Sequence, residues 1–240
     1  MTLPTDIPLV RGVDLSAIQG DVSDADWAHL ADQEVRFAYL RCVVGNERWT
    51  DQNVAARNAK RAREHGIRLG GYLFAYPLPH LQPAEQIDRF MRVLEGVGVD
   101  LPPAIDLEWP PRETKRPDGT LEDTWAKWGC WPTQLREWGL SALELLRAYV
   151  GPTPLVYSFP YWLQCIESGK APELARYHLW LAARPVNGRW PTRAEAEAVK
   201  VPAPWDHVAV MQHDGDGGQR LPSGKDADFS VALIDPGVLS

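Results

Sequence analysis

Short apolar runs rich in β-branched residues alternate with amphipathic helical stretches along most of this 240-residue chain. Such alternation is typical of a mostly parallel sheet or barrel that carries helices on its outside. The apolar runs predict eight strands, at residues 10–15, 35–43, 68–76, 103–108, 154–158, 178–183, 207–212 and 227–231. Helical periodicity predicts helices at residues 24–33, 53–65, 83–97, 133–149, 161–168 and 193–199. The fold class is therefore expected to be α/β.

No internal repeat, low-complexity run or linker-like change of composition divides the chain, so we expect a single domain over residues 1–240. A long insertion at residues 109–132 contains Pro110-Pro111 and the turn signal Pro117-Asp118-Gly119. It directly follows the predicted strand at 103–108. Loops after the carboxyl ends of strands build the active-site face of barrel enzymes. The insertion is therefore expected to overhang that face.

The predicted strand at 103–108 delivers two carboxylates one residue apart, Asp106 and Glu108. Because strand side chains alternate between faces, both lie on one face, roughly 6.6 Å apart at ~3.3 Å per residue. Two close carboxylates in a partly dry site cannot both ionise freely, so one pKa rises and that group stays a proton donor near neutral pH. Enzymes that cleave glycosidic bonds usually use such a pair of carboxyl groups. The alternative is a solvated pair, or one neutralised by Arg112 or Lys115.

Composition excludes several classes of partner. The net charge of −7 argues against a nucleic-acid partner, which requires a basic face, and it gives no attraction to anionic membranes. No apolar run approaches the ~20 residues that span a bilayer. The three cysteines, Cys42, Cys130 and Cys165, are odd in number and widely spaced, which indicates neither a disulfide framework nor a zinc site. We expect a monomer that needs no metal and no cofactor.

Tryptophan is unusually frequent, with eleven residues, and four of them cluster at Trp125, Trp128, Trp131 and Trp138. Aromatic rings suit stacking against sugar rings, but large aromatics also dominate ordinary cores. The cluster predicts a sugar-binding surface on or beside the insertion. Core packing is the alternative for each single ring.

Several segments, in order along the chain, resemble glycoside hydrolase family 25, the lysozymes typified by fungal and phage muramidases. The first is Gly12-Val13-Asp14-Leu15-Ser16-Ala17-Ile18-Gln19-Gly20. The later ones are Gly70-Gly71-Tyr72-Leu73-Phe74, Ala104-Ile105-Asp106-Leu107-Glu108, Pro154-Leu155-Val156-Tyr157-Ser158, Leu179-Trp180-Leu181-Ala182 and Ala227-Asp228-Phe229-Ser230. The resemblance spans about residues 10 to 235, and the ordered set is far more specific than any one segment.

This resemblance implies an irregular TIM-like (β/α) barrel with eight strands and fewer than eight helices. It also implies cleavage of the β-1,4 bond between N-acetylmuramic acid and N-acetylglucosamine in the glycan strands of peptidoglycan. Glu108 would be the general acid, and Asp106 would orient or polarise the acetamido group of the substrate or the attacking water. Asp14 and Asp228 would complete an acidic ring. The residues expected to shape sugar subsites are Tyr72, Tyr157, Trp180 and Gln212.

Three segments depart from the family pattern. Ala17-Ile18 replaces a bulky pair that ends in an aromatic residue, Val44 replaces an acid, and Met211-Gln212-His213 replaces Trp-Gln-Tyr. These changes favour a diverged muramidase whose sugar platforms were rebuilt by the insertion at 109–132. Two alternatives stay open: a non-catalytic module that binds cell-wall glycan or serves as a virion structural part, and a hydrolase for another N-acetylated glycan such as chitin.

The first residues of the chain lack the basic start and the apolar stretch of a secretory signal. We therefore expect cytoplasmic synthesis, followed by holin-dependent or particle-borne delivery to the cell wall.

Overall fold

A computed structural model describes residues 9–46, 52–183, 186, 188–215 and 219–234. Eight strands close into a barrel in the order β1-β10-β9-β8-β7-β4-β3-β2. These strands are β1 Val10–Leu15, β2 Val35–Val44, β3 Arg68–Phe74, β4 Ala104–Asp106, β7 Leu155–Ser158, β8 His178–Ala182, β9 Val210–Asp214 and β10 Asp228–Ala232. The predicted eight-stranded α/β barrel is confirmed.

One strand runs against the others. Seven of the barrel strands pair in parallel, namely β1, β2, β3, β4, β7, β8 and β9. Strand β10 is antiparallel to both of its neighbours, β1 and β9. Asp228, the first residue of β10, therefore pairs with Asp14 near the carboxyl end of β1. At the other end of the same ladder, Val10 pairs with Ala232. The reversal brings the start of β10 to the end of the barrel at which the parallel strands finish.

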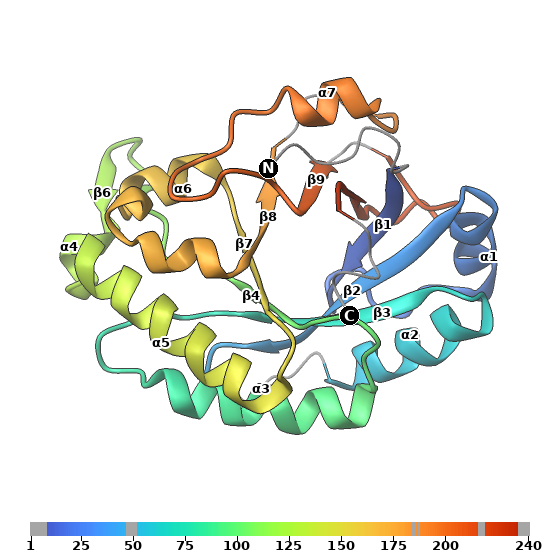
Figure 1. The fold of residues 1–240 in the computed structure, drawn as a ribbon, viewed down its shortest axis with the longest axis horizontal. Coiled ribbons are helices and arrows are strands. Elements are labelled where there is room, and N and C mark those ends of the chain that lie inside the picture. The colour runs from blue at the N-terminus through green and yellow to red at the C-terminus, as the bar shows by residue number, and fades with distance from the viewer. Residues whose placement is uncertain (1–8, 47–51, 184–185, 187, 216–218, 235–240) are drawn as a thin grey trace.

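Helices cover the outside of the barrel, and α3 and α5 run beside one another (Figure 1). Within the described residues there are seven α-helices, in agreement with the expectation of fewer than eight. They are α1 Asp24–Asp32, α2 Gln52–Glu64, α3 Pro83–Val97, α4 Thr124–Trp128, α5 Pro132–Val150, α6 Pro160–Cys165 and α7 Arg193–Glu197. None of these described helices is both long and apolar enough to cross a membrane.

The local sequence explains where the main helices begin. α1 starts in a capping box, in which the Ser23 side chain accepts from the Asp26 backbone N–H and the Asp26 carboxylate accepts from the Ser23 backbone N–H. α3 and α5 each begin with a proline at the first helical position, where its missing N–H leaves no helical hydrogen bond unmade. These signals explain why the predicted helix starts lie within about a residue of the observed ones.

The structure changes several predicted boundaries. β4 ends at Asp106, so Glu108 lies in the loop just beyond the strand. β9 begins at Val210, three residues after the predicted start. The insertion at 109–132, in which the sequence predicted no strand or helix, forms an antiparallel hairpin of β5 Glu113–Lys115 and β6 Leu121–Asp123, followed by α4. The two hairpin strands are polar and largely exposed, so they lack the apolar alternation that marked the other strands.

Large aromatic side chains pack together in the interior of the barrel. Tyr39 is fully buried, donates from its hydroxyl to Pro102 O at 2.9 Å, and packs against Trp180 with ring centroids 4.8 Å apart. Glycine makes room for such rings. A Cβ on Gly70 would lie 2.2 Å from the Tyr39 ring, and one on Gly12 would lie 2.1 Å from the Phe37 ring. Tyr39 is in register with Asp14 on the neighbouring strand, and Phe37 is in register with Gly12.

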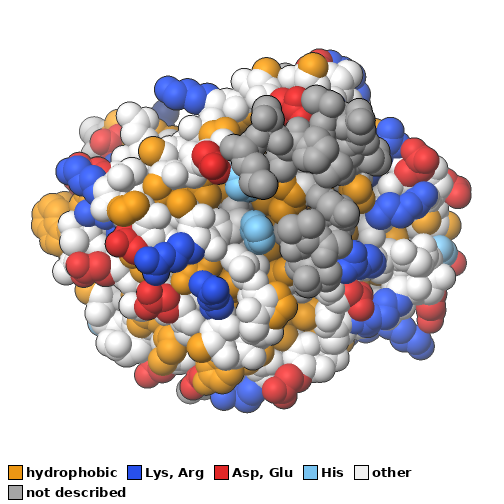
Figure 2. All heavy atoms as spheres, viewed as in Figure 1, with side chains coloured by type: hydrophobic (Ala, Val, Ile, Leu, Met, Phe, Trp, Pro, Cys, Tyr) orange, Lys and Arg blue, Asp and Glu red, His pale blue; other side chains and the backbone are white. Residues whose placement is uncertain are grey.

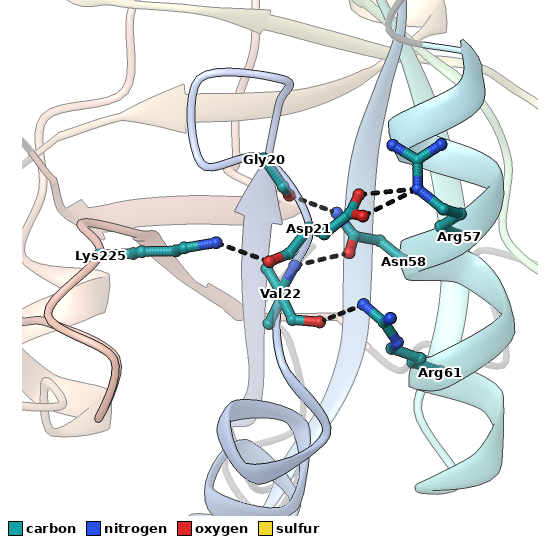
Figure 3. Close-up of polar contacts among 7 residues, drawn as sticks. All are labelled: Gly20, Asp21, Val22, Arg57, Asn58, Arg61 and Lys225. Atoms are coloured by element: carbon teal, nitrogen blue, oxygen red, sulfur yellow. Dashed lines mark hydrogen bonds and ion pairs between the residues drawn. The ribbon is translucent and has the colours of Figure 1, made fainter.

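The β1–α1 loop is fastened to α2, as Figure 3 shows. The buried Asn58 side chain accepts from Val22 N at 2.9 Å and donates to Gly20 O at 3.0 Å. Arg61 donates to Val22 O at 2.8 Å, and Arg57 forms a two-pronged contact with the Asp21 carboxylate at 2.9 Å. The loop that follows β1 is therefore held by three side chains of α2, and Lys225 donates to Asp21 O from the opposite side (Figure 3).

We expect Asn58→Ala to lower the free energy of unfolding by about 1–3 kcal/mol, because the buried N–H of Val22 loses its acceptor. Arg57→Ala is the matched control on the same loop. Its ion pair with Asp21 is solvent-exposed, with side chains 51% and 42% accessible, so its loss is expected to cost less than about 1 kcal/mol. Urea unfolding of both variants measures the difference. Equal effects would contradict the anchoring role of Asn58.

Candidate active site

A cavity of about 260 Å³ opens at the carboxyl end of the parallel strands. All eight site residues predicted from the sequence line it. They are Asp14, Tyr72, Asp106, Glu108, Tyr157, Trp180, Gln212 and Asp228. Arg41 and Asp226, which the sequence analysis did not single out, are also in the lining. The structure thus brings residues from barrel strands far apart in the chain, and from their loops, to one place.

Strand register sets the positions of these side chains. Phe74 pairs with Asp106, Asp106 with Tyr157, and Tyr157 with Trp180, across β3, β4, β7 and β8. Residues in register on neighbouring strands point to the same side of a sheet. This row therefore places Asp106 between two aromatic side chains. Glu108, two residues beyond Asp106, is half-buried at the same cavity.

A chain of hydrogen bonds fixes Asp14 on the other side of the cavity. Gln212 donates from Nε2 to both carboxylate oxygens of Asp14, at 3.1 and 3.2 Å. The Tyr157 hydroxyl donates to Gln212 Oε1 at 3.0 Å, so the amide of Gln212 is held in one orientation. Ser230 donates to Asp14 Oδ2 at 3.5 Å and accepts from Trp180 Nε1 at 3.1 Å. Asp14 is thereby positioned before any ligand arrives.

The two buried carboxyl groups of the cavity, Asp14 and Asp106, have raised pKa values. Burial raises the pKa of Asp106 well above its usual range, and the charges of Glu108 and Asp14 raise it further, while Arg41 opposes them. Burial likewise raises the pKa of Asp14 well above its usual range, with Asp228 as the next contributor. Burial also raises the pKa values of Tyr72 and Tyr157 well above those of exposed tyrosines. Protons are therefore retained in this cavity to a higher pH than on the open surface.

Asp106 has one oxygen that no protein group satisfies. Its side chain is 4% exposed, and Oδ1 has no hydrogen-bond partner among the described residues. A buried acceptor without a partner costs about 1–3 kcal/mol. An N–H or O–H group that enters the cavity and donates to this oxygen would remove that cost. The arrangement favours a ligand with a polar hydrogen at this position.

Arg41 brings a positive charge among the acids. It lies on β2, lines the cavity and sits over the Phe74 ring at 5.9 Å. The signal that could have found it is the period of two along β2, because Phe37 and Tyr39 already point into the barrel. On the face seen in Figure 2, Lys and Arg side chains are interspersed with Asp and Glu. Acidic groups are more concentrated in the cavity, where Arg41 is the one cation among the described lining residues.

The four clustered tryptophans divide into two kinds. Trp125 and Trp138 are buried, and their indole N–H groups donate to Pro110 O and Leu81 O, at 2.9 and 2.8 Å. They are core residues, as the alternative interpretation allowed. Trp128 and Trp131 are 38% and 55% exposed, and among the described residues Trp128 packs against Trp109 whereas Trp131 packs against no aromatic ring.

Within the described ranges, the histidine, cysteine and acidic side chains form no cluster of three or more suited to a metal ion.

Chemically, the cavity combines the half-buried carboxyl group of Glu108 with two buried carboxyl groups of raised pKa. A carboxyl that keeps its proton can protonate a leaving group, and preplaced carboxylates stabilise a positive charge that develops in a transition state. The geometry suits acid-catalysed cleavage of a bond to an acetal carbon, in which such a charge forms.

Comparisons with known proteins agree with this chemistry. The model of the family described as glycosyl hydrolases family 25 matches residues 13–218. In a search of curated proteins, no sequence matched the chain.

Solved structures with the same fold include a family 25 glycosyl hydrolase from Bacillus anthracis, 17% identical, with a TM-score of 0.69 over 97% of this chain and 93% of that one. A bacterial lysozyme from Streptomyces coelicolor is 22% identical, with a TM-score of 0.69 over 96% of this chain and 94% of that one. A family GH25 lysozyme from Aspergillus fumigatus is 18% identical, with a TM-score of 0.68 over 97% and 99%. At these identities the structural likeness establishes a shared fold.

Proposed function

The chain belongs to glycosyl hydrolase family 25, and from this membership we propose that it is a lysozyme that cleaves peptidoglycan. The bond broken would be the β-1,4 bond between N-acetylmuramic acid and N-acetylglucosamine. The observation that carries the proposal is the gathering of Asp14, Asp106, Glu108 and Asp228 around one cavity. Two of the structural relatives, from Streptomyces coelicolor and Aspergillus fumigatus, are lysozymes, which supports the choice of peptidoglycan as substrate.

Glu108 is the general acid in this proposal. It lines the cavity and is only half-buried, so the oxygen of a glycosidic bond can reach its carboxyl group. Proton transfer to that oxygen makes the departing sugar a neutral alcohol. Such transfer contributes typically about 10²–10⁴-fold to the rate.

Asp106 supports the reaction from beside Glu108. Both sugars of peptidoglycan carry an acetamido group with one N–H, and the unpartnered Oδ1 of Asp106 is an acceptor of the required kind. Accepting that hydrogen bond would orient the acetamido group and polarise it for attack on the sugar carbon. Asp14, held by Gln212, and Asp228 would stabilise the positive charge of the oxocarbenium-like or oxazolinium-like transition state.

We expect the protein to release glycan fragments whose reducing ends are all N-acetylmuramic acid. Purified peptidoglycan is digested, the fragments are reduced with borohydride, and mass spectrometry identifies the reduced sugar. Fragments that end in reduced N-acetylglucosamine would reject the assigned bond. Binding to several wall types without any release would favour a glycan-binding module, and faster cleavage of chitin oligomers than of peptidoglycan would favour a chitin-type hydrolase.

A further inference from the structure

A row of four aromatic rings leads out of the cavity, and we call Phe74, Tyr76, Trp109 and Trp128 the aromatic ladder. Phe74 lines the cavity at the end of β3, and its ring lies 5.9 Å from that of Tyr76. Tyr76 lies 4.4 Å from Trp109, and Trp109 lies 4.5 Å from Trp128, all measured between ring centroids. The ladder thus runs from the cavity to the insertion at 109–132, and its third ring follows Glu108 directly in the chain.

The ladder is held in place by surrounding structure. The Tyr76 ring packs over Gly45, where a Cβ would come within 2.3 Å of it. Trp128 stands on α4, which is capped by Asp123, whose side chain accepts from Ala126 N at 2.9 Å. The buried Trp125 on the same helix donates to Pro110 O and fixes α4 against the barrel. Rings held in this way lose little conformational freedom when a ligand binds.

The ladder is also accessible. Phe74, Tyr76 and Trp109 are only partly buried, and Trp128 is 38% exposed. Partly buried rings present flat apolar surface on which the C–H face of a sugar ring can pack. Trp125, three residues before Trp128, has no such surface because it is 1% exposed. Helix α4 therefore buries one of its two tryptophans as an internal support and exposes the other to solvent.

The cavity alone is too small for a long ligand. Its volume of about 260 Å³ lies below the ~300–1,000 Å³ of pockets that enclose a drug-sized molecule. A glycan strand is a chain of many sugar rings, so most of a bound strand must lie outside the cavity. The aromatic ladder is an aromatic surface continuous with the cavity lining through Phe74.

We propose that the aromatic ladder is an extension of the substrate site that binds sugar residues of a glycan strand beyond those held in the cavity. The enzyme then prefers long strands to short oligosaccharides. This inference rests on the proposed function for its choice of ligand. It adds Tyr76, Trp109 and Trp128 as specificity-determining residues to the acidic side chains and to Tyr72, Tyr157 and Trp180.

The test compares Trp128→Ala with Trp131→Ala, a matched control in the same insertion that is 55% exposed and lies outside the ladder. Steady-state kinetics are measured on peptide-free glycan strands sorted by length and on a short tetrasaccharide. We expect Trp128→Ala to raise KM for long strands about tenfold, with kcat within about twofold, and to leave kcat/KM for the tetrasaccharide unchanged. Trp131→Ala is expected to match the wild type on both substrates.

A loss of equal size on long strands and on the tetrasaccharide would overturn the proposal, because it would indicate a disturbance of Glu108 transmitted through Trp109. Unchanged KM for long strands would also overturn it. Binding is measured separately by titrating long strands into Glu108→Gln with and without Trp128→Ala. Weaker binding on loss of Trp128 supports the ladder even if the wild type cleaves no strand, and equal binding rejects it. This readout separates failure of the ladder from failure of the proposed function.

Discussion

Glu108→Gln is expected to reduce the release of reducing ends from peptidoglycan by about 10²–10⁴-fold or more, while the barrel stays folded. Glutamine has nearly the same shape as glutamate but carries no acidic proton. The leaving oxygen then departs without protonation. Because Glu108 lines the cavity and is only half-buried, the change should disturb little packing.

A matched control comes from the insertion. Glu113 is an exposed carboxylate on β5 outside the cavity, so Glu113→Gln should retain wild-type activity. Reducing-end assays give the rates, and circular dichroism with thermal melting verifies the fold. Near wild-type cleavage by Glu108→Gln would refute its assignment as general acid. Loss of activity together with loss of the folded signal would instead point to a structural role.

Asp106→Asn is expected to lower activity by about 10²-fold or more and to change the pH dependence of stability. The amide keeps the size of the carboxyl group, but it cannot ionise and so cannot supply a negative charge when positive charge develops in the transition state. Its effect on stability has the opposite sign from that of an ordinary surface carboxylate. Burial and the neighbouring acids raise the pKa of Asp106 in the folded protein.

The sign of the pH effect follows from proton binding. Above the unfolded-state pKa of about 4, the folded protein holds a proton that the unfolded chain has released. The contribution of Asp106 to the free energy of unfolding is therefore fully present below the unfolded-state pKa. It is lost as pH rises through the raised folded-state pKa. A tenfold difference in proton affinity between the folded and unfolded states corresponds to about 1.4 kcal/mol of stability. Asp106→Asn removes this dependence, so the variant should lose less stability than the wild type between about pH 4 and pH 7.

Chemical denaturation at pH 4, 5, 6 and 7 measures the slope for both proteins. Asp118→Asn is the control, because Asp118 is exposed in the hairpin turn and hydrogen bonds from Thr120 lower its pKa. That variant should keep full activity and the wild-type loss of stability toward neutral pH. If Asp106→Asn retained the wild-type slope, Asp106 would not be the group that holds the extra proton.

The sequence predicted the barrel well because the relevant signals are local. Each apolar run and each helix-start signal is contained in a few neighbouring residues. These signals placed β1, β3 and α3 within two residues of their observed bounds. The hairpin of β5 and β6 was missed because its exposed polar strands carry no such signal.

The candidate site depended on contacts that the sequence does not show. Asp14 and Asp228 are far apart along the chain and meet only through the β1–β10 register. Resemblance to a known family grouped them, whereas local pattern could not. Trp125 and Trp128 lie on one short helix, yet only the first is buried, because packing against Pro110 and the barrel decides which ring faces inward.

The pairing of Val10 with Ala232 has a practical consequence for engineering. That pair lies at the amino end of β1, whereas Asp14 and Asp228, in the same ladder, border the cavity. The polypeptide chain therefore enters and leaves the described barrel on the side away from the cavity. A targeting module joined by a flexible linker at the described residues Val10 or Ala232 would leave the barrel on the side away from the substrate path. Such fusions should add affinity for a chosen cell surface without competing with the glycan strand.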